Sequence, residues 1–157
     1  MKRTLILPAA LLSVTMAMAG DEAFDRATLK GLKSVGITLD AVPEDLAKEG
    51  VTEEALRSRV AQRLQQAGIP IDAASKEFVG LRFVAVREAK GPYAVAITIA
   101  FYQPVTLVRD TSIRRAPDTW DVETIFLADP KMVHRATTES VDDLADRFIA
   151  AWRSVNP

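Results

Sequence analysis

Few side chains in this chain have the types and spacing needed for catalysis. There is one histidine, His134, and there is no cysteine. A catalytic triad or a histidine metal site needs partner side chains in a tuned environment. No carboxylate stands immediately beside His134, which falls in a predicted linker between Val133 and Arg135. We therefore interpret His134 as a solvated surface residue, and the sequence predicts no catalytic residue, no metal site and no cofactor.

A second candidate is a group of carboxylates, Asp118, Asp121 and Glu123. Such oxygen ligands could hold a hard cation or support hydrolysis. However, no glycine-containing calcium loop accompanies them, and Asp121 and Glu123 share the polar face of a predicted strand. We interpret the group as a charged sheet edge, a common protection against aggregation, and keep a carboxylate hydrolase as the third hypothesis of function.

A third candidate is a basic connection formed by Arg109, Arg114 and Arg115. Guanidinium groups can bind carboxylate or phosphate with two hydrogen bonds. The alternative is a solvated turn with a local Arg109–Asp110 ion pair of small energy. The sequence contains no phosphate-binding loop, dinucleotide motif, zinc-protease motif or serine-hydrolase motif. An anion bound by these arginine residues would therefore have no recognisable catalytic motif beside it.

The first nineteen residues have the organisation of a secretory signal peptide. Lys2 and Arg3 precede an apolar run, and Ala17-Met18-Ala19 is a small-x-small cleavage site before Gly20. Cleavage after Ala19 would leave 138 of the 157 residues and change the net charge from −1 to −3. We expect a periplasmic or secreted product with no transmembrane segment after cleavage, and a mildly acidic protein of this kind is not expected to bind nucleic acid.

The remaining chain is predicted to form one α+β domain at residues 34–157, preceded by an N-terminal arm at 20–33. Residues 93–102 alternate strictly between bulky and small side chains, which is typical of a strand. Further strands are predicted at 34–42, 81–88, 105–109 and 119–127, with a polar connection over 109–118. Lys90-Gly91-Pro92 predicts an antiparallel hairpin between 81–88 and 93–102.

Two amphipathic helices complete the prediction. Thr52 is a suitable N-cap for a helix over 53–67, and Gly68 suits its C-terminal end. A second helix is predicted to begin near Thr138, with an apolar stripe that includes Phe148 and Trp152. The order β-α-β-β-β-β-α predicts a two-layer sandwich, in which a mostly antiparallel sheet of four to five strands carries both helices on one face.

The small face of the 93–102 strand is the predicted interaction surface. It consists of Ala94, Ala96, Thr98 and Ala100, with Tyr102 at its end. If the helices cover the bulky face, this small face is either exposed without a role or contacts a partner, such as a second sheet in a homodimer. We therefore favour a non-enzymatic domain that binds a protein partner or a cell-envelope component.

The second hypothesis of function is a small-ligand carrier. Its pocket would lie between the sheet and the helices. The predicted lining residues are Tyr93, Phe101, Trp120 and Trp152, with Arg109 at the mouth.

Four stretches resemble a family of exported bacterial proteins with no established activity. They are Leu29–Asp40, Gly50–Ile71, Ala94–Asp110 and Val141–Pro157, and Thr119-Trp120 also fits. The resemblance implies an envelope location and one α+β domain, and it supplies no catalytic residues. More distantly, the order of elements is similar to that of small envelope-accessory domains, such as the amino-terminal domain of TolB and secretion lipoproteins of the PelC kind, although this chain lacks the cysteine that carries a lipid anchor.

Overall fold

The computed structural model describes residues 20–157, and the predicted signal peptide, residues 1–19, lies outside the described residues. The helices are α1 (Ala23–Ala27), α2 (Glu44–Lys48), α3 (Glu53–Gln66) and α4 (Pro130–Val155). The strands are β1 (Gly36–Leu39), β2 (Phe78–Arg87), β3 (Tyr93–Tyr102), β4 (Val105–Leu107), β5 (Asp110–Arg115) and β6 (Asp118–Ala128).

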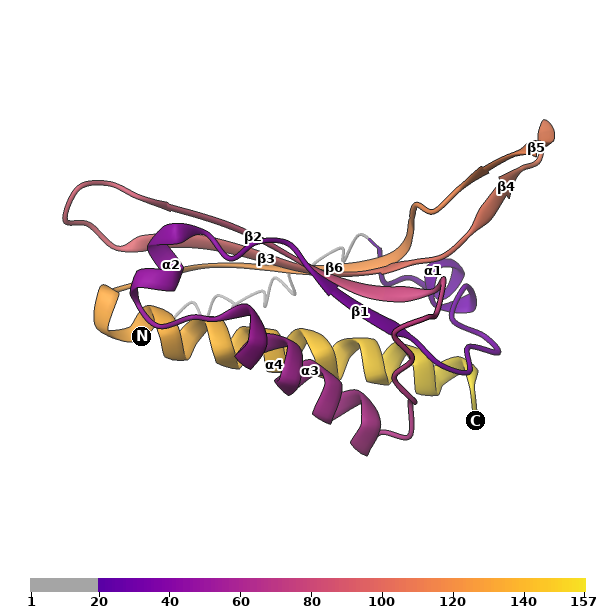
Figure 1. The fold of residues 1–157 in the computed structure, drawn as a ribbon, viewed down its shortest axis with the longest axis horizontal. Coiled ribbons are helices and arrows are strands. Elements are labelled where there is room, and N and C mark those ends of the chain that lie inside the picture. Colours follow the sequence, from indigo (N-terminus) through magenta and orange to yellow (C-terminus); the bar gives the residue numbers. More distant parts are fainter. Residues whose placement is uncertain (1–19) are drawn as a thin grey trace, which may run out of the picture.

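The main sheet has the strand order β1-β2-β3-β6. The β2–β3 and β3–β6 pairs are antiparallel, and β1 runs parallel to β2. The helices α3 and α4 lie together on one face of this sheet, while the other face is left without a helical layer (Figure 1). The predicted α+β class, the mostly antiparallel sheet and the β2–β3 hairpin are confirmed.

The core lies between the sheet and the two long helices. Five alternate bulky residues of β3 face it and are at most 2% exposed: Tyr93, Val95, Ile97, Ile99 and Phe101. From β6, Trp120 packs edge-on against Phe148 of α4, with 5.2 Å between the ring centroids. The alternation of bulky and small side chains therefore sets which face of β3 meets the helices.

Helix α3 begins and ends where its sequence predicts. The Thr52 hydroxyl accepts a hydrogen bond from the Ala55 backbone N–H at 3.3 Å, as an N-cap should. Gly68 has a φ of +88°, the left-handed conformation that glycine adopts without steric cost. The face of α3 toward the core contains Leu56, Val60 and Leu64, all buried.

Helix α4 is longer than predicted. It begins at Pro130 rather than near Thr138, so its 26 residues span about 39 Å. Asp129 is the N-cap and Pro130 the first residue of the helix, a position to which proline is well suited. Val133 and Thr137 are fully buried and extend the apolar stripe upstream. His134 therefore lies on a helix and not in a linker.

The predicted polar connection over 109–118 is instead part of a second, two-stranded sheet. Strands β4 and β5 pair antiparallel and form an arm that projects from the main body (Figure 1). The register between β3 and β6 shifts between Phe101 and Tyr102, shortly before Pro104. Polar side chains at solvent-exposed positions gave no apolar alternation from which β5 could be predicted.

The N-terminal arm, residues 20–33, packs onto the same core as the rest of the chain. It contains the short helix α1, and the side chains of Leu29 and Leu32 that follow are 0% and 9% exposed. The Asn156 side chain near the other end of the chain accepts a hydrogen bond from Gly31 N–H and donates one to the Leu29 carbonyl. The N-terminal arm and the end of α4 thus lie side by side (Figure 1).

Candidate functional site

The outer face of the sheet, opposite the helices, carries an exposed apolar patch. The cross-strand register aligns Val84 with Ala96 and Ile125, and aligns Val86 with Ala94 and Leu127. The four larger side chains, Val84, Val86, Ile125 and Leu127, are 63%, 60%, 71% and 73% exposed. We call these six residues the apolar patch. On a sheet with one covered face, the residues that point away from the core are normally polar. Here, two successive outward-facing positions on each of three adjacent strands are apolar, and this exposure needs an explanation.

A hollow lies beside the apolar patch, at the end of the β2–β3 hairpin. Its volume is about 520 Å³, and it shares Val86 and Ala94 with the patch. The rest of its lining comes from the turn, namely Arg87, Glu88, Gly91 and Pro92. A partner side chain could enter this hollow while the flat part of the patch is covered.

The other half of the outer face is polar. The Thr98 hydroxyl donates a hydrogen bond to Glu123 at 3.0 Å, and Arg82 lies 4.0 Å from the Asp118 carboxylate. Burial raises the pKa of Asp121, and the nearby Asp118 carboxylate raises it further. In the predicted acidic group, Asp118 and Glu123 are thus exposed at one end of the sheet, whereas Asp121 is half-buried. Within residues 20–157, no three side chains of His, Cys, Asp or Glu are grouped to hold a metal ion.

The predicted interaction surface is divided between these two halves. Ala94 and Ala96 are half-buried members of the apolar patch, whereas Thr98 and Ala100 are only 7% and 0% exposed. Tyr102 stacks on Phe78 with 5.0 Å between ring centroids. The alanines of β3 correctly indicated where along that strand the patch lies, but most of its exposed area comes from residues of β2 and β6 that were not predicted. The alternation of Val84 and Val86 with the bulky inward-facing residues of the same strand could have indicated that they point outward.

Gly80 explains how Tyr102 is held. A Cβ atom on Gly80 would lie 2.8 Å from the Tyr102 ring, closer than real Cβ contacts allow. Glycine therefore lets the ring lie flat across β2 beside Phe78. The stacked pair covers this end of the outer face, so the open apolar surface is confined to the hairpin end.

The structure does not bring together the five residues predicted to line a ligand pocket. Tyr93 and Phe101 are at opposite ends of β3, and the Tyr93 hydroxyl donates a hydrogen bond to Glu49 at 2.8 Å. Phe101 and Trp120 both pack against Phe148. Trp152 donates a 3.4 Å hydrogen bond to the Leu32 carbonyl and is only partly buried at the edge of the same core, whereas Arg109 is exposed on the arm.

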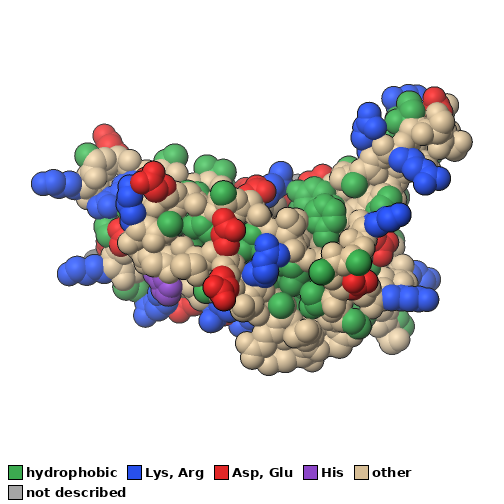
Figure 2. All heavy atoms as spheres, in the orientation of Figure 1, with side chains coloured by type: hydrophobic (Ala, Val, Ile, Leu, Met, Phe, Trp, Pro, Cys, Tyr) green, Lys and Arg blue, Asp and Glu red, His purple; other side chains and the backbone are tan. Residues whose placement is uncertain are grey.

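The arm carries the basic group predicted as an anion site. Arg109, Arg114 and Arg115 are all exposed, and Val108 at the turn is 101% exposed. Figure 2 shows Lys and Arg side chains gathered on this projecting segment. Asp110 accepts hydrogen bonds from the hydroxyl and the backbone N–H of Ser112, which lower its pKa. In the described residues Asp110 thus closes a turn, and no Arg109–Asp110 ion pair forms there.

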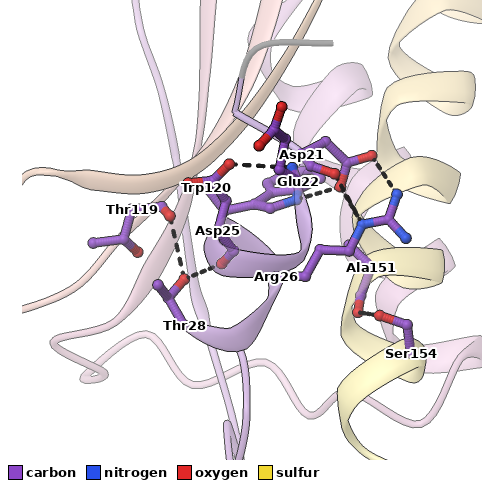
Figure 3. A network of polar contacts seen from close by, with 9 residues as sticks. All are labelled: Asp21, Glu22, Asp25, Arg26, Thr28, Thr119, Trp120, Ala151 and Ser154. Carbon is purple, nitrogen blue, oxygen red and sulfur yellow. Dashed lines mark hydrogen bonds and ion pairs between the residues drawn. The ribbon is translucent and has the colours of Figure 1, made fainter. Parts of the chain in front are cut away.

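A polar network joins the first described residues to the sheet (Figure 3). The Asp21 carboxylate accepts hydrogen bonds from Arg26 at 2.8 Å and from the Trp120 indole at 2.7 Å. Burial alone would raise the pKa of Asp21, but the hydrogen bonds from Arg26 and Trp120 outweigh it and lower that pKa. Thr28 further joins this segment to β6 through the Thr119 carbonyl.

His134 is exposed on α4. Its backbone carbonyl accepts a hydrogen bond from the Thr138 hydroxyl at 2.8 Å.

The helices within residues 20–157 include none that is long and apolar enough to cross a membrane.

Comparisons with known proteins give a limited result. No family model matches the chain, and no curated protein matches it in sequence. Among solved structures, a dodecameric PelC variant from Paraburkholderia phytofirmans has a TM-score of 0.42 at 10% identity, covering 74% of this chain and 86% of that one. A minor lipoprotein from Acinetobacter baumannii has a TM-score of 0.37 at 14% identity, covering 76% of this chain and 91% of that one. Since both TM-scores are below 0.5, we infer function from the surfaces of this chain alone.

Proposed function

We propose that this chain is an exported, non-enzymatic domain that binds a protein partner through the apolar patch. The observation that carries the proposal is the exposure of Val84, Val86, Ile125 and Leu127, at 60–73%, on β2 and β6, the two strands that flank β3. Full burial of one such side chain is worth about 1.5–3 kcal/mol, so a partner that covers the patch gains substantial free energy. The β-sheet holds these side chains in fixed positions, which lowers the entropy cost of binding.

The surroundings of the apolar patch favour a protein partner over an anionic membrane. Charged residues of both signs border it, with Arg82 and Glu123 on the polar side and Glu88 at the hairpin. An apolar centre with a mixed polar rim is the usual composition of a protein interface. An anionic lipid surface instead attracts clusters of Lys and Arg.

Export is part of this proposal and rests on the sequence. The predicted signal peptide ends at Ala19, directly before Gly20. We place the processed domain in the periplasm or outside the cell. There, a partner could be another envelope or secreted protein, or a second copy of this chain.

Site-specific photocrosslinking in intact cells tests the proposal. A photoreactive residue replaces Ile125 in the patch or, as a matched control, Gln65, which is exposed on α3 in the other layer. We expect a crosslinked protein from position 125 and none from position 65. The second-site change Val84→Glu should abolish the crosslink while the circular dichroism spectrum and the melting temperature stay unchanged.

Each outcome has a defined meaning. A crosslink to a second copy would identify the partner as the chain itself. Equal crosslinking from positions 125 and 65, no protein crosslink from position 125, or a crosslink that Val84→Glu does not weaken would each reject the apolar patch as the binding surface.

A further inference from the structure

Gly20, the first described residue, lies in an acidic recess at the start of β6. The Asp121 backbone N–H donates a hydrogen bond to the Gly20 carbonyl at 3.2 Å. A cavity of about 350 Å³ is bounded here by Gly20, α1 and the start of β6, and three carboxylates line it: Asp25, Asp118 and Asp121. Residue 20 is thus held against a group of negative charges by the backbone of the sheet.

The nitrogen of Gly20 is close to the Asp121 carboxylate. A Cβ atom placed on Gly20 would lie 2.7 Å from the Asp121 Cγ. The nitrogen is bonded to the same Cα, so standard bond lengths place it within about 5 Å of that carboxyl carbon. A small rotation of the terminal residue brings the nitrogen and a carboxylate oxygen into ion-pair range.

Asp121 is short of positive partners. Within residues 20–157, no hydrogen bond or ion pair engages its carboxylate. The charged groups that face it are Asp118 and Glu123 on β6, Asp25 on α1 and Arg82 on β2, and Arg82 lies 4.0 Å from Asp118. Burial and these negative neighbours both raise the pKa of Asp121, so a cation placed beside it would be strongly favoured.

We propose that removal of residues 1–19 creates the missing cation, a terminal ammonium group on Gly20 that pairs with Asp121 and fixes the amino end of the mature domain. This inference rests on the proposed export, and cleavage at the Ala19–Gly20 bond is its first step. Water is the co-reactant: its hydroxyl goes to the Ala19 carbonyl carbon, which leaves as a carboxylate, and the Gly20 nitrogen becomes an amine that is protonated at neutral pH. Before cleavage, the same nitrogen is a neutral amide and cannot form the ion pair.

The neighbouring residue makes this pairing effective. Asp21 is already anchored by Arg26 and Trp120, so the terminal residue needs little further ordering to meet Asp121. An ammonium group paired with a carboxylate has a higher pKa in the folded state than in the unfolded state. Its stabilisation is therefore complete below the unfolded pKa of about 8, and is lost as the pH rises through the higher folded pKa.

The test compares two forms of the mature protein. One begins at Gly20, as confirmed by intact mass after export, and the other retains one additional residue, Ala19. We expect the Gly20 form to melt at a temperature higher by about 2 °C or more at pH 7, and this difference should disappear above about pH 10. Asp121→Asn should remove the difference at every pH, and NMR titration should give the Gly20 amine a raised pKa only when Asp121 is present.

Glu123→Gln is the matched control. It removes one negative charge from the same strand but leaves Asp121 in place, so the difference between the two forms should persist. Equal melting temperatures of the two forms across the pH range would overturn the inference. A mass showing a different amino terminus would also overturn it, and it would refute the predicted cleavage site without bearing on the crosslinking test of the apolar patch.

Discussion

The indole N–H of Trp120 donates a 2.7 Å hydrogen bond to the carboxylate of Asp21. These two residues lie 99 positions apart in the chain, and the bond joins the first described residues to β6, the last strand of the main sheet. The Trp120 side chain is 1% exposed and the Asp21 side chain 7%, so water has little access to replace either partner.

Asp21→Ala should therefore be destabilising. It leaves the buried Trp120 N–H without an acceptor and removes the partner of Arg26, which we expect to cost about 1–3 kcal/mol in the free energy of unfolding. Urea denaturation measures this cost. Asp21→Asn, which keeps an acceptor oxygen for Trp120, should cost less, and an equal cost for both variants would contradict the role assigned to this hydrogen bond.

Asp142 connects the two long helices and should make stability depend on acidic pH. Its carboxylate lies 2.6 Å from Arg59 and 3.0 Å from Arg63, both on α3. Burial alone would raise the pKa of Asp142, but the hydrogen bonds from Arg59 and Arg63 outweigh it and lower that pKa. Stabilisation from such a group is present above its unfolded pKa of about 3.9 and is lost as the pH falls through the lower folded pKa.

We therefore expect Asp142→Asn to be less stable than the unchanged protein at neutral pH, and to lose less stability between about pH 5 and about pH 2. Thermal melts across this range provide the measurement. Asp143→Asn is the control, because Asp143 is exposed on the same helix. Parallel pH profiles for the unchanged protein and Asp142→Asn would show that the pair with α3 does not titrate as expected.

Thr137 offers a stabilising substitution. Its hydroxyl is buried and has no hydrogen-bond partner among the described residues. Thr137→Val keeps the shape and removes the unpaired polar group, which should raise the free energy of unfolding by about 1 kcal/mol. The same substitution at the next residue, Thr138→Val, breaks a hydrogen bond to the His134 carbonyl and should not stabilise. Chemical denaturation of the two variants compares them directly.

The aromatic stripe of α4 should not contribute evenly to stability. Phe148 is 0% exposed and packs against both Trp120 and Phe101, so Phe148→Ala should cost about 3–5 kcal/mol. The sequence gives the same expectation for Trp152, but that residue is only half-buried, and we now expect Trp152→Ala to cost less. Urea denaturation in which Phe148→Ala cost under about 1 kcal/mol would remove Phe148 from the core.

The elements that the sequence predicted well are those with strong local signals. The strict alternation of residues 93–102, the Thr52 cap and Gly68 each determine a local structure without help from the rest of the fold. The parts that were missed depend on tertiary context. The first turns of α4 depend on burial of Val133 and Thr137 under the sheet, and β5 depends on its pairing with β4.

The candidate site shows the same division. The alanines of β3 indicated where along the strand an open surface lies, because a small face is visible in one sequence segment. The cross-strand neighbours that complete the apolar patch, such as Val84 and Ile125, are 41 positions apart, and only the sheet register aligns them. Likewise, nothing local shows that Gly20 meets Asp121, because that contact depends on how the amino end crosses the edge of β6.

The position of α4 after all the strands of the main sheet has a consequence for synthesis. This helix provides the layer that covers β3, so Val95, Ile97 and Ile99 stay uncovered until the last 26-residue helix has left the ribosome. Until α4 has been made, a ribosome-bound chain cannot close this core and leaves an apolar sheet face exposed. In the export that we propose, this order would delay compaction without any additional device.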